Sequence, residues 1–170
     1  MKIHIIGCSG SGKTYLANAL SKKYNISHFD LDDIQWDNNA KEYGKKRTLD
    51  ERKALLQEIL YNNDEWIIEG VYHAWVQQSF DEADKIYVLN MSNYLCKSRI
   101  IMRSIKRKLG ILKGKKETLK SVYNLLKWTE TFQNKNLKEI RSILDRYDNK
   151  VIWLSRKKDV AKIIKAVCLT

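Results

Sequence analysis

The chain contains no proline, and only seven glycines and three cysteines among its 170 residues. The cysteines, at positions 8, 96 and 168, have no metal-binding spacing and cannot all pair. No apolar run approaches the roughly 18 residues of a membrane-spanning helix, and the apolar run at the start is too short for a signal peptide. These absences exclude a disulfide scaffold and a helical membrane protein. We therefore expect a reduced, cytoplasmic protein with no membrane partner.

Positive charge is in excess and is concentrated in one segment. The formal net charge is +12, and residues 97–127 carry eleven Lys and Arg side chains against one acid, Glu117. Any polyanion that the protein binds, such as a nucleic acid, is expected to meet this segment. A helical lid that closes over ATP would need the same charge, so the segment does not discriminate between the two partners.

Short apolar runs alternate with segments of helical spacing, which predicts an α/β fold with a parallel sheet. The expected strands are 3–6, 26–31, 66–68, 85–89 and 151–154. The expected helices are 13–24, one that begins at a capping box over 48–51 and ends near 62, 93–109, 116–147, and 158–168. The length fits a single domain, with a core of about 1–92 and 148–170 and a basic helical lid of about 93–147. We place a mobile flap, or an ordinary loop, between Gly110 and Gly114.

One motif carries most of the chemistry. The segment Gly7-Cys8-Ser9-Gly10-Ser11-Gly12-Lys13-Thr14 fits G-x-x-x-x-G-K-[ST] at every position and lies between an expected strand and an expected helix. Its glycines let the backbone N–H groups surround phosphate oxygens, and the helix adds its positive end. Lys13 is expected at the β/γ-phosphates and Thr14 at Mg²⁺, whereas Cys8 is expected to be a small filler. The predicted ATP-binding residues are Gly7, Ser9, Gly10, Ser11, Gly12, Lys13 and Thr14.

The length argues against a motor or an AAA-type ATPase. The fourth expected strand ends in Leu89-Asn90-Met91-Ser92, so the Asn-Lys-x-Asp signature of a GTPase is absent there. A small-molecule or nucleotide kinase fits best.

Acidic residues follow the second and third expected strands, opposite the phosphate loop. We expect Asp32 to orient and deprotonate an acceptor, and Asp30 to belong to the outer sphere of Mg²⁺. Glu69 ends the third strand and would hold Mg²⁺ through water, while it also borders the acceptor pocket. The alternative is that these are solvated acids that cap the next helical turn.

Three arginines, Arg99, Arg103 and Arg107, recur every four residues and therefore share one helix face. We expect Arg99 and Arg103 to be catalytic by closing over the transferred phosphoryl group. The alternative is a solvated basic face.

Aromatic and basic residues near the strand ends complete the predicted site. Trp36, Tyr72 and His73 would line the acceptor pocket, or else serve as packing. Arg156 follows the last strand and would border the adenine, while His4 is expected to be structural.

Several segments together resemble a known family. They are GCSGSGKT (7–14), FDLDDIQW (29–36), WIIEGVYHAW (66–75), ADKIYVLN (83–90) and the arginines of 99–107. This set, over residues 1 to about 160, resembles the small adenylate-kinase-related P-loop proteins of the DNA topology modulation (FlaR-like) family. The resemblance implies a nucleotide-kinase-like three-layer sandwich with a five-stranded parallel sheet in the order 2-3-1-4-5 and a helical lid. Asn90 departs from the acid that often ends the fourth strand in that family, so we assign it no role.

The main hypothesis is an ATP- and Mg²⁺-dependent kinase that transfers the γ-phosphate to a small acceptor, a nucleotide or another small molecule. The alternative is a nucleotide-dependent DNA-binding regulator, although no helix-turn-helix, zinc-finger or single-strand-binding signature is present. A third hypothesis is a nucleotide-binding protein with little catalytic activity. The acceptor, the preference for ATP over GTP and the oligomeric state are left open.

Overall fold

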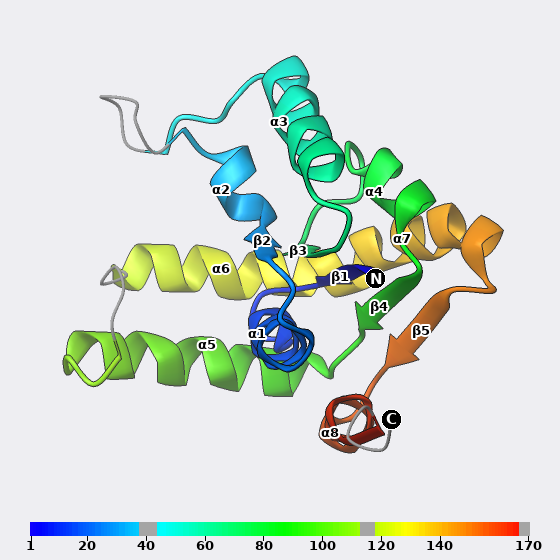
Figure 1. Ribbon diagram of the computed structural model, residues 1–170. Coiled ribbons are helices and arrows are strands. Elements are labelled where there is room, and N and C mark those ends of the chain that lie inside the picture. The colour runs from blue at the N-terminus through cyan, green and yellow to red at the C-terminus, as the bar shows by residue number, and fades with distance from the viewer. Residues whose placement is uncertain (38–43, 113–117, 167–170) are drawn as a thin grey trace.

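The computed structural model describes residues 1–37, 44–112 and 118–166, and a five-stranded parallel sheet forms its middle layer (Figure 1). The strands are β1 (Lys2–Gly7), β2 (His28–Asp30), β3 (Trp66–Gly70), β4 (Lys85–Leu89) and β5 (Val151–Leu154). Their order is β2-β3-β1-β4-β5, which confirms the predicted fold class and strand order. Helices α1 and α8 pack on one face, and α3 and α4 lie on the other.

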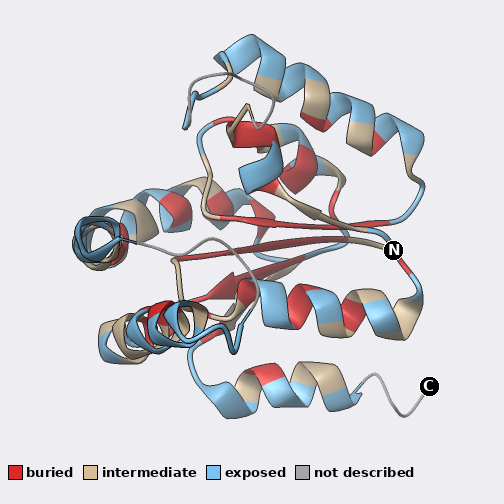
Figure 2. Cartoon of the chain, turned by 90° about the vertical axis from the view of Figure 1, so that its left-hand side faces the viewer, coloured by how far each residue is buried: buried red, intermediate tan, exposed pale blue. Residues whose placement is uncertain are grey.

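β1 occupies the centre of the sheet and is buried on both faces (Figure 2). Ile3, Ile5 and Ile6 are at most 1% exposed, as a strand between two helical layers requires. His4 is also fully buried, and its Nδ1 lies 2.8 Å from the Ser79 hydroxyl. Burial lowers the pKa of His4 to about 3, so the imidazole is neutral and structural.

The helices with the clearest end signals form where the sequence predicts them. α1 (Lys13–Tyr24) begins after Gly12 and ends at Asn25, whose φ of 57° is left-handed. α3 (Leu49–Asn62) begins with the predicted capping box, in which the side chains of Thr48 and Glu51 each accept from the other's backbone N–H.

Two short helices, α2 (Leu31–Gln35) and α4 (Gln77–Glu82), were not predicted. The prediction of a second strand over 26–31 was wrong at its ends, because β2 spans only residues 28–30. The Asp30 carboxylate accepts the backbone N–H of Asp32 at 2.9 Å and so caps α2. The predicted strand was expected to continue to residue 31, but β2 ends at Asp30 and α2 begins at Leu31.

The basic region forms a long helical hairpin that projects beyond the sheet (Figure 1). It comprises α5 (Asn93–Lys108) and α6 (Leu119–Thr131), and a π-helical turn (Phe132–Asn136) joins α6 to α7 (Leu137–Leu144). A 3₁₀ turn (Asp145–Tyr147) precedes β5, and α8 (Lys157–Ala166) follows it. The helix predicted over 116–147 is thus divided. No helix within the described ranges is long and apolar enough to cross a membrane.

The segment predicted as a lid, 93–147, is not uniformly separate from the core. Cys96, Phe132, Ile140 and Leu144 are at most 1% exposed and belong to the same buried cluster as the sheet. The flap was predicted between Gly110 and Gly114. Gly110 follows the end of α5 and has a left-handed φ of 73°. Gly114 lies outside the described residues, as do residues 113 and 115–117.

Candidate functional site

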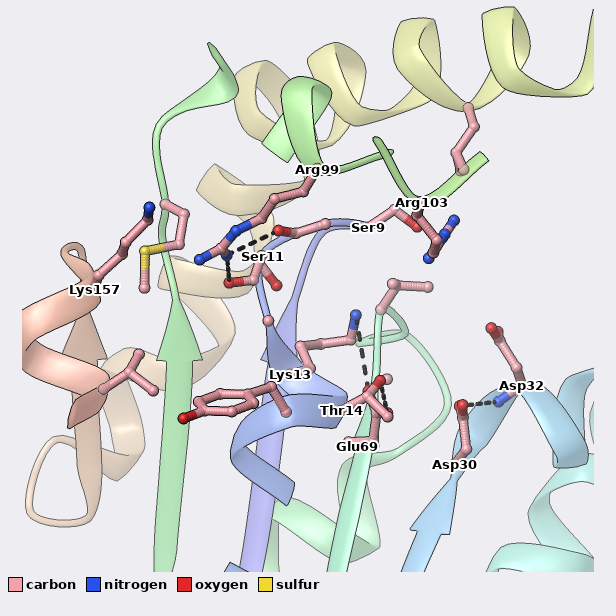
Figure 3. Close-up of a pocket in the computed structure, with 18 of the residues that line it drawn as sticks. Ser9, Ser11, Lys13, Thr14, Asp30, Asp32, Glu69, Arg99, Arg103 and Lys157 are labelled. Carbon is pink, nitrogen blue, oxygen red and sulfur yellow. Dashed lines mark hydrogen bonds and ion pairs between the residues drawn. The ribbon is translucent and has the colours of Figure 1, made fainter. Parts of the chain in front are cut away.

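A cavity of about 940 Å³ lies at the carboxyl ends of the central strands. The phosphate loop forms its floor, β2 and β3 supply acids from one side, and α5 supplies arginines from the other (Figure 3). The charged lining residues are Lys13, Asp30, Asp32, Glu69, Arg99, Arg103, Arg107 and Lys157. Parallel α/β sheets bind ligands at this edge.

The glycines of the phosphate loop are required by its backbone. Gly10 and Gly12 have φ values of 76° and 105°, which side chains rarely adopt. A Cβ atom on Gly10 would also lie 2.4 Å from the carbonyl oxygen of Cys96 on α5. The loop is therefore packed directly against the first turns of α5.

Lys13 and Thr14 converge on one buried carboxylate, that of Glu69 at the end of β3. The Lys13 Nζ atom donates to the Cys8 carbonyl at 3.3 Å and lies 3.8 Å from Glu69 Oε2. The Thr14 hydroxyl donates to Glu69 Oε1 at 2.5 Å. Burial raises the pKa of Glu69, but the nearby His28 ring, Lys13 and Thr14 outweigh it and hold the pKa below its ordinary value. Glu69 is therefore a charged carboxylate that holds both functional side chains in place.

The oxygen atoms around Thr14 fit Mg²⁺, which prefers hard oxygen ligands and keeps several of its waters. Thr14 would be a direct ligand, and Glu69 and Asp30 would act through water. In the described parts of the chain, no group of three or more His, Cys, Asp or Glu side chains forms a complete metal cage. The remaining ligands would then be phosphate oxygens and water, as in other phosphate loops.

Asp30 and Asp32 lie across the cavity from Lys13 (Figure 3). Burial, followed by the negative charges of Glu69 and Asp32, raises the pKa of Asp30 to about 6. Asp32 is exposed, and its Oδ1 accepts a hydrogen bond of 2.6 Å from the Tyr72 hydroxyl. The Tyr72 bond leaves the carboxylate with a second oxygen for an acceptor.

The arginines of α5 divide into two roles. The Nη1 atom of Arg99 donates to the carbonyl oxygens of Gly10 at 3.1 Å and Ser11 at 2.8 Å, so this guanidinium braces the phosphate loop. Arg103, one turn later, enters the cavity above Lys13 and Asp32 (Figure 3), and Arg107 lines it further along the helix. Sequence spacing placed the three on one face but did not show which one binds the loop.

Five predicted site residues do not line the cavity, and one of them is Gly7 at the end of β1. Arg156 pairs with Asp159 at 3.1 Å, and the next residue, Lys157, lines the cavity instead. His73 pairs with Glu139 of α7 at 3.0 Å. Trp36 has the Lys46 ammonium 5.5 Å from the centre of its ring.

Tyr72 is not among the lining residues either, but it reaches the site through Asp32. Lys157 was missed because the sequence analysis chose its neighbour, Arg156. Which of these two consecutive residues faces the cavity depends on the rotation of α8, and no sequence signal fixes that rotation.

Comparison with known proteins adds two findings. Residues 3–119 match the model of a protein family described as AAA domain. The chain is also 29% identical over 140 residues to the uncharacterized protein YqaC of Bacillus subtilis (strain 168), which covers 82% of this chain and 76% of that protein. The length argued against an AAA-type ATPase, and the match shows a P-loop domain of this family within residues 3–119 without testing for ATPase activity.

Proposed function

The chain belongs to the AAA domain family and has the fold of a P-loop nucleotide-binding, kinase-like protein, and from that premise we propose that it transfers the γ-phosphate of ATP, with Mg²⁺, to a small acceptor. One observation carries the proposal. A single cavity joins the phosphate loop to two carboxylates, Asp30 and Asp32, on the opposite wall, with Arg103 entering between them. Donor and acceptor would meet there under positive charge.

The donor side is formed by the loop and α1. Backbone N–H groups of residues 9–14 surround the β- and γ-phosphates, and Lys13 exchanges its bond to the Cys8 carbonyl for a phosphate oxygen. Mg²⁺, when bound beside Thr14, would neutralise part of the phosphate charge. Glu69 keeps Thr14 oriented through its hydrogen bond.

The acceptor side is formed by α2 and the residues after β3. Asp32, held by Tyr72, accepts a hydrogen bond from the acceptor hydroxyl and takes its proton as the oxygen bonds to phosphorus. The bond between the γ-phosphorus and the β–γ bridging oxygen breaks, and ADP leaves. Arg103 stabilises the negative charge on the transferred group.

The test is transfer from γ-labelled ATP, with Mg²⁺, to a panel of nucleoside monophosphates, nucleosides and small hydroxy acids. Lys13→Ala should lower the rate at least about a hundredfold, since it removes a cation that meets the transferred group. Lys22→Ala, which removes an exposed charge from the same helix, is the matched control. Unchanged turnover by Lys13→Ala would refute the assignment.

The DNA-binding alternative, and with it a topology modulation role, stays a prediction. Part of the basic segment is engaged within the protein, because Lys97 pairs with Glu130 at 2.8 Å and Arg99 binds the loop. Titration with DNA at two salt concentrations tests the alternative, and the absence of binding near 0.15 M salt, about physiological ionic strength, would remove it.

A further inference from the structure

Two cysteines from distant parts of the chain are in contact beneath the phosphate loop. Cys8 is the second residue of the loop, Cys96 lies in the first turns of α5, and their Sγ atoms are 3.4 Å apart. Both side chains are at most 1% exposed. A disulfide has an S–S distance of about 2.05 Å, so the sulfur atoms would have to approach by only about 1.4 Å. Phosphoryl transfer uses neither thiol.

The surroundings of the pair favour a reactive sulfur on Cys96. The Cys8 thiol donates a hydrogen bond to Cys96, which lowers the pKa of Cys96, and the charges of Arg99 and Lys13 act in the same direction against burial. The neighbouring residues Ser9, Gly10 and Arg99 line the cavity. Neither thiol lines the cavity itself, so a small oxidant would reach the sulfur atoms through a local movement of the loop or of α5.

We propose that Cys8 and Cys96 form a modification site for a peroxide, which converts them into a disulfide that lowers the affinity of the protein for nucleotide. The Cys96 thiolate attacks one oxygen of hydrogen peroxide, the O–O bond breaks, and a sulfenic acid and hydroxide form, the hydroxide becoming water with a proton. The Cys8 sulfur then bonds to the Cys96 sulfur, and the hydroxyl leaves as a second water with the Cys8 proton. Two thiols lose two electrons, and the peroxide is reduced to two waters.

The disulfide acts on nucleotide binding because the loop has no free space against α5. The Cys96 carbonyl already occupies the place that a Cβ of Gly10 would need, and Arg99 fixes the Gly10 and Ser11 carbonyls. Because the loop and α5 are in direct contact, we expect the approach of the two sulfur atoms to shift the loop backbone, including the Cys8 carbonyl that binds Lys13. The N–H groups that would surround phosphate are carried by this same backbone.

Thermodynamic linkage makes the proposal quantitative. If the disulfide weakens nucleotide binding by some factor, saturating nucleotide must disfavour the disulfide by the same factor. For a two-electron couple, a tenfold factor raises the reduction potential by about 30 mV.

The experiment uses the full chain with Cys168→Ala, which leaves Cys8 and Cys96 as the only cysteines. Hydrogen peroxide should remove two hydrogens from the intact mass and link the peptides that contain Cys8 and Cys96. The oxidised protein should bind mant-ATP at least about tenfold more weakly, and dithiothreitol should restore the affinity. Redox titration with glutathione should give a higher potential with mant-ATP than without it.

Cys96→Ala in the same background is the control, and its affinity for mant-ATP should not respond to peroxide. If that variant does not fold, Cys96→Ser replaces it and is compared only with its own untreated form. The proposal is overturned if folded protein forms no disulfide, if the disulfide leaves the affinity unchanged, or if the control loses affinity equally. Because binding is the measurement, the result does not depend on whether an acceptor is phosphorylated.

Discussion

Replacing Arg99 with alanine will destabilise the protein, because this guanidinium is bonded to the phosphate loop. Its Nη1 atom donates to the Gly10 carbonyl at 3.1 Å and to the Ser11 carbonyl at 2.8 Å. Hydrogen bonds from charged groups contribute about 1.5–3 kcal/mol each. One nitrogen makes both bonds, so we take about 2 kcal/mol for the pair rather than the sum. In a domain of this size 1 kcal/mol shifts the melting temperature by about 2–4 °C, which gives a decrease of about 4–8 °C.

The assay is thermal unfolding followed by circular dichroism, with two comparison variants. Lys97→Ala, on the same helix as Arg99, removes a surface ion pair with Glu130 of α6 and should lower the melting temperature much less. Arg99→Lys keeps the charge without the planar fork and should lie between Arg99→Ala and the parent. If Arg99→Ala melts no lower than Lys97→Ala but loses turnover, Arg99 acts on phosphate and the bracing role is refuted.

Other perturbations test the loop and its acids. Gly10→Ala should cost several kcal/mol in urea unfolding, whereas Gly110→Ala, with a similar φ but no atom within 4 Å of the new Cβ, should cost only about 1–2 kcal/mol; equal losses would contradict the packing against α5. The pKa of Asp30 is raised to about 6, so the affinity for Mg²⁺-nucleotide should increase as the pH rises through that value, and Asp30→Asn, which preserves the cap, should flatten the profile. Without nucleotide, the stabilising effect of the raised pKa of Asp30 is present at low pH and is lost as the pH rises through about 6. Asp30→Asn should therefore gain stability relative to the parent above that pH. Parallel profiles of stability against pH would contradict this prediction.

The fold was predictable where local signals are strong. The apolar run of β1 and the turn at Gly12 fix where β1 ends and α1 begins, and the capping box at Thr48 fixes the start of α3. The limit of β2 was not predictable, because it depends on whether Asp30 bonds to its own chain two residues later. A side-chain-to-backbone bond of this kind competes with the strand and leaves no periodicity in the sequence.

The candidate site also has a part that the sequence predicts and a part that it does not. The phosphate-loop motif is contiguous, so the roles of Lys13 and Thr14 were predicted from residue order alone. The bond from Arg99 to the loop and the contact between Cys8 and Cys96 depend on how α5 packs against residues far away in the chain. Sequence spacing gives a helix its faces but does not give its rotation or its distance from a partner.

The central place of β1 has a consequence for synthesis of the protein. Among the strands of the described residues, β1 is translated before the others, yet it pairs with residues 66–70 on one side and 85–89 on the other. The contacts of Cys96 and Arg99 with the loop lie later still. A nascent chain therefore carries an unpaired apolar segment until the partner strands at residues 66–70 and 85–89 have also been translated. The phosphate loop is thus translated well before the residues of α5 that complete it, and in that interval the unpaired strand is exposed to aggregation or to chaperone binding.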